Sequence, residues 1–247
     1  MKKLIVPTIA LLLMVAGGAC ARQSGTTVNA AGQPVQSDRA EVLNRLNEAG
    51  KNLEQLISAP DDAIPENVLA NAKCVAIVPD MVKGGFVFGG QHGRGVATCR
   101  TPGKGWSAPA FFTITGGSWG AQIGAESVDL TMLVMDDRGM NDLLSANWQI
   151  GADASIAAGP VGRQASAATD YKLESSVLTY SRTKGLFAGL TLNGANIRQD
   201  NDSTTAFYGK NYDFRTLLTG KIPPPAQANT FLASVRQNFR ESVNATK

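Results

Sequence analysis

The sequence contains few of the residues that build metal centres and strongly charged interfaces. Its 247 residues include one histidine and three cysteines, and the formal net charge is +3 at pH 7. One cysteine and two lysines, Lys2 and Lys3, lie in the N-terminal leader described below. Without those two lysines the 23 basic side chains become 21, against 20 acidic ones, a net charge near +1. Two cysteines and His92 are too few good ligands for a metal site. We expect no metal, no cofactor and no nucleic-acid partner.

Motifs of nucleotide and hydrolase sites are missing or incomplete. Residues 103–105 (Gly-Lys-Gly) lack the upstream glycine and the following Ser/Thr of a phosphate loop. Residues 116–120 match the G-x-S-x-G elbow of hydrolases, with Ser118 as the nucleophile. However, His92 precedes Ser118, whereas that fold places its histidine later, and the pattern after Ser118 is β rather than helical. We therefore expect no enzyme, and a serine hydrolase at Ser118 is the least favoured alternative.

The chain has no apolar run long enough for a stable membrane span. Leu4–Val15 is a short apolar core between a basic start and small residues, which is typical of a secretory signal over residues 1–19. Cys20 then resembles the acylated cysteine of a bacterial lipobox, although that box usually carries Leu three positions earlier. Ordinary cleavage after Ala21 is the alternative. Residues 20–37 are expected to be a lipidated (palmitate-bearing) cysteine and a flexible polar tether.

Residues 38–247 show the pattern of one α+β domain. No long strand–helix alternation appears, which disfavours a doubly wound sheet. We expect mainly antiparallel sheet, as a sandwich or barrel-like structure, with an N-terminal amphipathic helix and C-terminal helices. Candidate strands fall at 75–78, 85–89, 96–100, 110–115, 118–126, 129–135, 148–158, 175–181 and 187–197. Candidate helices fall at 38–57, 65–72, 139–146, 201–220 and 226–243.

The helix over residues 38–57 allows two interpretations. Its apolar residues recur at helical spacing on one face: Val42, Leu43, Leu46, Ala49, Leu53, Leu56 and Ile57. Charged residues, among them Glu41, Arg45, Lys51 and Glu54, are expected at other positions. The face could dock on the core of the domain or lie on a membrane. The second interpretation lacks the dense Lys/Arg face and the large aromatic residues of membrane-surface helices.

Glycine is concentrated in one stretch. Residues 84–124 hold 12 of the 26 glycines, interleaved with aromatic and β-branched residues. Such a segment has enough apolar content to fold as short strands joined by tight turns. Cys74 and Cys99 lie at the ends of two apolar β-like runs, and a hairpin-like pairing would bring them together. We expect a disulfide in an exported protein, which stabilises by roughly 3–4 kcal/mol. Two buried free thiols are the alternative.

Basic residues gather near the glycine turns. Backbone N–H groups at such turns, together with Arg and Lys, suit a phosphate head group. Trp106 could lie at the interface depth of a bilayer. The candidate head-group residues are Lys83, Arg94, Arg100, Lys104, Trp106, Arg182 and Lys184. Ordinary solvated charge around β-turns is the competing interpretation.

The order of several short motifs over about residues 38–218 resembles the SYLF domain. The runs that carry this resemblance are Val78-Pro79, Lys83-Gly84-Gly85-Phe86, Gly93-Arg94-Gly95, Gly105-Trp106-Ser107-Ala108-Pro109, residues 116–124, Gly159-Pro160-Val161-Gly162, residues 180–189 and Tyr208-Gly209. With its leader and tether, the chain resembles an exported bacterial member of that family.

The resemblance implies a non-catalytic phospholipid-binding module. Eukaryotic members bind phosphoinositides and phosphatidic acid, partly through an N-terminal amphipathic helix and basic residues, and some act with actin regulators. Helix 38–57 here is not notably basic. We expect an envelope lipoprotein, at the periplasmic face of the outer membrane, whose domain (residues 38–247) binds anionic phospholipid head groups. The alternative is a structural or stress-related envelope protein that binds another protein.

Overall fold

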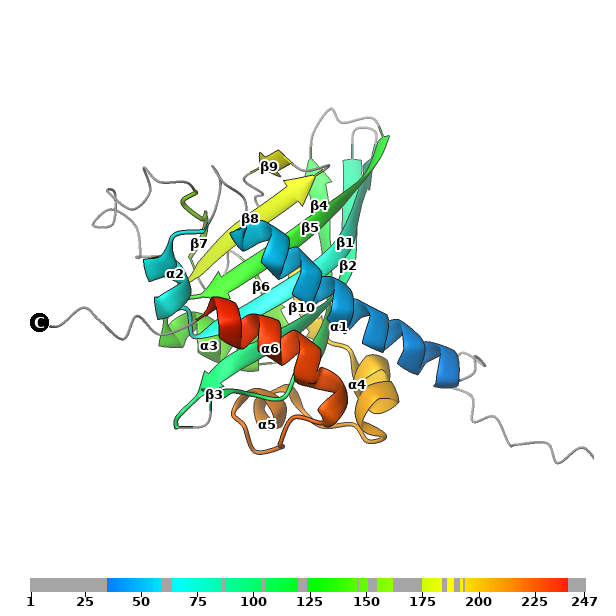
Figure 1. Ribbon diagram of the computed structural model, residues 1–247. Helices are drawn as coiled ribbons and strands as arrows, with labels where there is room; N and C mark the ends of the chain where they lie inside the picture. The colour runs from blue at the N-terminus through cyan, green and yellow to red at the C-terminus, as the bar shows by residue number, and fades with distance from the viewer. Residues whose placement is uncertain are drawn as a thin grey trace, which may run out of the picture.

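A curled sheet of ten strands carries the fold in the computed structural model (Figure 1). The structure describes residues 35–58, 64–85, 88–103, 105–119, 124–145, 147–150, 155–161, 175–183, 186–188, 192 and 194–239. The predicted signal, Cys20 and most of the predicted tether fall outside these residues, as do Lys104 and Lys184.

The strands form a half-barrel in which the described pairs are antiparallel, except β7 with β8. Their bounds are β1 Cys74–Gly85, β2 Phe88–Thr101, β3 Gly105–Trp106, β4 Ala110–Trp119, β5 Gly124–Val134, β6 Asn147–Gln149, β7 Ile156–Ala158, β8 Val177–Thr183, β9 Leu186–Ala188 and β10 Asn196–Gln199. Their order is β6-β10-β4-β2-β1-β5-β8-β7, with β3 beside β2 and β9 beside β8. The β1–β2 hairpin therefore lies between β4 and β5, which are themselves consecutive.

Helices cover both faces of this sheet. The helical elements are α1 Val35–Ile57, α2 Glu66–Asn71, α3 Asp137–Leu144, α4 Asn201–Tyr208, α5 Phe214–Leu218, η2 Ala226–Ala228 and α6 Asn229–Asn238. Helices α1 and α6 lie side by side across one face (Figure 1), where α1 contacts β1 and β2. Helices α3 and α5 contribute Leu143, Phe214 and Leu217 to the core on the other face.

Burial on two faces explains the composition of β1. Val75 and Ile77 belong to the core beneath α1 and α6, whereas Ala76 and Val78 belong to the core on the opposite face. All four are at most 1% exposed. Because strand side chains alternate between faces, a central strand covered on both sides is apolar throughout.

The apolar face of α1 docks on the domain, as the first interpretation of this helix predicted. Val42, Leu46, Ala49, Leu53 and Leu56 are at most 4% exposed and belong to one core with the sheet and α6. None of the helices in the described part of the chain combines the length and the hydropathy that a bilayer crossing needs.

The predicted α+β class, with mainly antiparallel sheet and helices at both ends, is confirmed, but some local predictions were wrong. Pro79-Asp80 does not end a strand, because it forms a bulge within β1 in which Asp80 has a φ of 51°. Gly116-Gly117 lies inside β4 rather than in a turn. The single strand predicted over residues 148–158 is instead two, β6 and β7, at opposite edges of the sheet.

Candidate functional site

The candidate head-group residues do not form one patch. Lys83 pairs with Gln91 across β1 and β2, and Arg100 lies nine residues further along β2. At the rise of an extended strand these positions are about 30 Å apart. The structure therefore separates two of the cations that are close in sequence, and each position is described by its own contacts.

Trp106 is part of the core, and the half-buried Arg100 lies against it. The Arg100 guanidinium donates to Ala72 O at 3.0 Å, at the end of α2, and to Phe239 O at 2.6 Å, after α6. It also lies 4.9 Å from the Trp106 ring centroid. Trp106 is 5% exposed and packs edge-on against Phe239. This burial contradicts the placement of Trp106 at a bilayer interface, and the contacts of Arg100 explain its position without a ligand.

Arg94 belongs to a polar cluster that joins α1, β2 and α4. The cluster consists of Glu41, Arg45, Arg94, Asp200 and Ser203. Arg94 Nε donates to Asp200 Oδ2 at 3.1 Å, and Arg94 Nη2 donates to Ser203 Oγ at 3.0 Å. Arg45 Nη1 donates to the same hydroxyl at 3.0 Å. Glu41 Oε1 accepts from both arginines, from Arg45 Nη2 at 3.0 Å and from Arg94 Nη1 at 2.6 Å.

Asp200 is the buried acid of this cluster. As the N-cap of α4 it accepts from Ser203 N at 2.9 Å, and its other oxygen accepts from Ser203 Oγ at 2.7 Å. Burial alone raises the pKa of the Asp200 carboxyl. The hydrogen bonds from Ser203 and the charges of Arg94 and Arg45 outweigh that effect and hold the pKa below its ordinary value. Desolvation, followed by the charge of Arg94, lowers the pKa of Arg45.

Sequence reasoning placed Arg45 among the charged residues outside the apolar face of α1, and this was wrong. Its side chain is 6% exposed. The signal was present, because residue 45 stands three positions after Val42 and four before Ala49, spacings that fall on the buried stripe. What the pattern could not supply was its partner, Asp200, which is 155 positions away.

Arg182 belongs to a second polar cluster, around Asp129 on β5. Arg182 lies 3.4 Å from Asp129 Oδ2 and also donates to Gln55 of α1. The other oxygen of Asp129 accepts from Asn52 of α1 at 2.8 Å and from Asp80 N at 3.1 Å. The Asp129 carboxylate on β5 thus holds three elements together: the bulge of β1, the C-terminal half of α1 and, through Arg182, β8.

Lys83 lies where the sheet extends past its helical cover. We call this region the open sheet end: residues 82–84, 89–92, 115–117 and 126–127. Val82 there is 53% exposed, and its cross-strand partner His92 is also exposed. Burial lowers the pKa of the half-buried Lys83 ammonium, and the charge of Glu126, which pairs with Lys83 across β1 and β5, opposes that shift. Figure 1 shows β1, β2, β4 and β5 crossing α1 and continuing past it at the top of the view.

Cys74 and Cys99 face each other across β1 and β2. Their Cα atoms are 3.9 Å apart and their sulfur atoms 2.05 Å apart, the separation of a disulfide. The flanking backbone bond runs from Arg100 N to Lys73 O, so the two cysteines form a non-hydrogen-bonded pair. Side chains of such pairs approach closely in antiparallel sheet, which is the geometry that a cross-strand bridge requires.

The G-x-S-x-G match has a different setting from a hydrolase elbow. Ser118 lies inside β4 and pairs with Gly89, and the next described element is strand β5. The elbow requires a sharp turn from a strand into a helix. The sequence match therefore lacks the backbone that gives that motif its chemistry.

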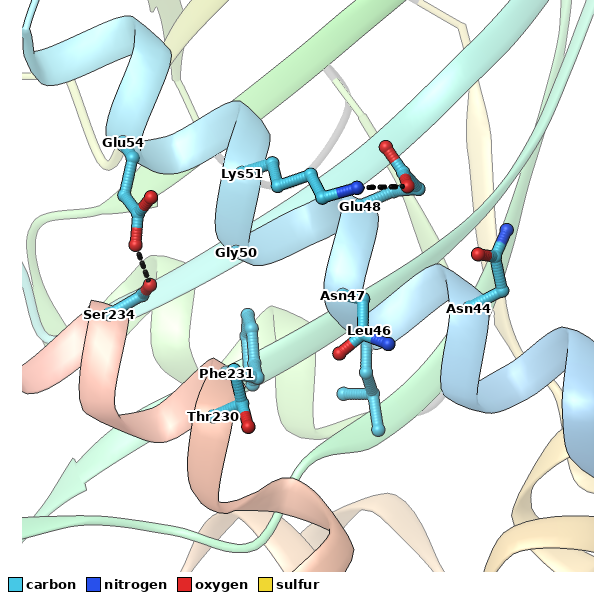
Figure 2. Close-up of a pocket in the computed structure, with 10 residues that line it drawn as sticks. All are labelled: Asn44, Leu46, Asn47, Glu48, Gly50, Lys51, Glu54, Thr230, Phe231 and Ser234. Atoms are coloured by element: carbon cyan, nitrogen blue, oxygen red, sulfur yellow. Dashed lines mark hydrogen bonds and ion pairs between the residues drawn. The ribbon is translucent and has the colours of Figure 1, made fainter.

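A polar groove of about 270 Å³ lies between α1 and α6 (Figure 2). Leu46 and Phe231, each 1% exposed, lie beneath it. Figure 2 shows Glu54 of α1 bonded to Ser234 of α6, and Lys51 paired with Glu48 along α1. The Glu54–Ser234 bond joins the two helices, so the groove forms the polar rim of their contact.

Comparison with known proteins gives a consistent result. Residues 115–238 match the family model Ysc84, described as "Las17-binding protein actin regulator". The SH3 domain-containing YSC84-like protein 1 of Rattus norvegicus is 32% identical over 185 residues, which cover 74% of this chain and 54% of that protein. LAS seventeen-binding protein 3 of Saccharomyces cerevisiae is 35% identical over 188 residues, 74% of this chain and 41% of that protein. The chain thus spans about half or less of the length of these relatives. The resemblance drawn from the short motifs is confirmed, and the chain belongs to the Ysc84 family, the family of the SYLF domain.

Proposed function

We propose that this domain binds anionic phospholipid through its open sheet end. The observation that carries the proposal is Val82, a large apolar side chain that is 53% exposed beside Lys83. The two side chains point to opposite faces of β1, because strand side chains alternate. A membrane that meets the end of the sheet can contact both, Val82 at the acyl chains and the Lys83 ammonium at phosphate. Among the described large apolar side chains, only Val161 is comparably exposed, at 38%.

The same proposal places the chain in the bacterial envelope. Residues 1–19 act as the signal, Cys20 carries the acyl chains, and residues 20–37 tether the domain (38–247) to the periplasmic face of the outer membrane. Each buried CH₂ of an acyl chain contributes about 0.8 kcal/mol, and a second contact strengthens weak anchoring. Mass spectrometry of the mature N-terminus tests this part. Acylation of Cys20 supports it, and an unmodified start at Arg22 contradicts it.

A protein partner is the competing function. The names of the family model and of the yeast relative record binding to Las17. For an exported chain, the corresponding interpretation is a structural or stress-related envelope protein that binds another protein. The flotation experiment below separates the two functions, because only a lipid-binding domain floats with protein-free vesicles.

The test uses the chain without residues 1–20, so that no acyl group contributes to binding. We expect it to float with phosphatidylglycerol vesicles and not with phosphatidylcholine vesicles, and to dissociate as salt rises. Val82→Asp and Lys83→Ala should each weaken binding severalfold. Matched controls are Val161→Asp and Lys51→Ala, which change an exposed valine and an exposed lysine elsewhere. Absence of binding to any phospholipid, or equal loss in the controls, would contradict the proposal.

A further inference from the structure

Glu41 holds an unusual position in the cluster of Glu41, Arg45, Arg94, Asp200 and Ser203. A single oxygen, Oε1, accepts one hydrogen bond from each of two arginines. Yet the Glu41 side chain is 54% exposed, while those of Arg45 and Asp200 are 6% exposed. The carboxylate therefore reaches the two guanidinium groups from the solvent side and lies over them.

The inner part of the cluster is bonded independently of Glu41. Asp200 Oδ2 accepts from Arg94 Nε and from Ser203 Oγ. The Ser203 hydroxyl in turn accepts from Arg45 Nη1 and Arg94 Nη2. These bonds fix the two guanidinium groups with Arg45 Nη2 and Arg94 Nη1 directed toward Glu41.

The charges show what Glu41 neutralises. Two guanidinium groups face two carboxylates, those of Asp200 and Glu41. If Glu41 turns outward, one positive charge is uncompensated, and one guanidinium N–H from each arginine is exposed together. Convergent guanidinium donors are the groups that proteins use to bind phosphate and related oxyanions.

We propose that Arg45 and Arg94 form an oxyanion-binding site that the Glu41 carboxylate closes in this structure. The ligand class is a phosphate monoester or inorganic phosphate, whose oxygen takes the place of Glu41 Oε1. Rotation of the exposed Glu41 side chain is sufficient to open the site, so α1 can stay docked through Val42 and Leu46. Glu41 then competes with the ligand as a tethered anion, and its effective concentration sets the affinity that is observed.

The proposal is tested by removing the competitor. Binding of inorganic phosphate to the purified mature chain is measured by calorimetry for wild type, Glu41→Ala and Glu41→Ala/Arg94→Ala. We expect Glu41→Ala to bind phosphate at least about tenfold more tightly than wild type, the equivalent of one charge-assisted hydrogen bond. The double variant should lose this gain. Glu48→Ala, which removes another α1 glutamate that pairs with Lys51, is the control and should leave phosphate binding unchanged.

Glu41→Gln guards against a folding defect, because its amide oxygen can still accept from the arginines while the charge is removed. It should show part of the gain, with a circular dichroism spectrum like that of wild type. No gain in either Glu41 variant, or an equal gain in the double variant or in Glu48→Ala, would overturn the proposal.

Vesicles identify the source of the phosphate group. If the ligand is a lipid, Glu41→Ala should also gain binding to phosphatidylcholine vesicles that contain phosphatidic acid, relative to pure phosphatidylcholine. A gain with inorganic phosphate alone supports a soluble anion as the ligand of the same site. Lys83→Ala should leave phosphate binding unchanged, so failure of the open sheet end and failure of this site are distinguishable.

Discussion

Asp200 Oδ2 lies 3.1 Å from Arg94 Nε, although 106 positions separate the two residues in the chain. The contact joins the first turn of α4 to the middle of β2, and the carboxylate also caps α4. Arg94 is 36% exposed, but Asp200 Oδ2 also lies 3.5 Å from Arg45 Nη1, and both of those side chains are 6% exposed. Breaking a buried ion pair from one side leaves the partner charge uncompensated. We therefore expect the stability of the domain to depend strongly on the Asp200 carboxylate.

We expect Asp200→Asn to lower the free energy of unfolding by roughly 3–5 kcal/mol. Urea denaturation monitored by circular dichroism measures this change. Asp202→Asn is the matched control, because Asp202 lies in the same turn of α4 but is exposed. A loss below about 1 kcal/mol for Asp200→Asn would place this pair among surface ion pairs of little energetic effect.

The same carboxyl predicts a pH dependence of stability. Its pKa in the folded chain is below its ordinary value of 3.8, so the unfolded chain binds its proton first as the pH falls. The stabilisation is present above about pH 3.8 and is lost as the pH falls through the lower folded pKa. Unfolding free energies of wild type and Asp200→Asn should therefore converge at acidic pH. A difference between them that stays constant down to pH 2.5 would contradict the prediction.

Gly95 is required by a close contact within the sheet. A Cβ atom at this position would lie 2.4 Å from Phe112 Cζ and 2.8 Å from Ile77 O, and the backbone oxygen cannot move aside. We expect Gly95→Ala to lower the free energy of unfolding by about 1–3 kcal/mol, the range for overpacked cores. Gly117→Ala in the neighbouring strand meets nothing within 4 Å and should change the thermal midpoint little. Equal effects of the two substitutions would show that strand propensity, rather than the contact, determines the result.

The Cys74–Cys99 bridge is a prediction about the oxidation state of these two cysteines. If it forms, replacing both residues by Ala should lower the free energy of unfolding by about 3–4 kcal/mol, since the bridge joins positions 25 apart in sequence. Thiol titration in denaturant provides the direct measurement, and an oxidised chain should show no thiol from this pair. Two reactive thiols per domain would indicate that the cysteines are a buried reduced pair.

Local patterns predicted α1 and the central strands because the spacing of their apolar residues follows directly from which faces are buried. The apolar spacing from Val42 to Leu56 needs only the 3.6-residue period of a helix and a core to dock on. The run from Cys74 to Val78 needs only a strand that is buried on both faces. Pro79-Asp80 misled the prediction because its backbone is held by Asp129, a residue on another strand.

Local patterns could not predict the contacts of the cationic residues. Lys83, Arg94, Arg100 and Arg182 are alike in sequence, each close to a turn or a glycine. In the structure, Arg100 donates hydrogen bonds to the ends of α2 and α6, and Arg94 binds the N-cap of α4. Arg182 binds side chains of α1 and β5. Those partners are 28 to 139 positions away in the sequence.

The sequence by itself determined the family, the α+β class and the amphipathic helix that closes the domain, because ordered motifs and periodicity depend on near neighbours in the chain. Only the tertiary structure decided that Trp106 is core, that Arg45 is buried and that Glu41 covers two arginines. Those assignments depend on which distant carboxylate, carbonyl or ring the fold brings within hydrogen-bonding or van der Waals distance. No local pattern contains that information.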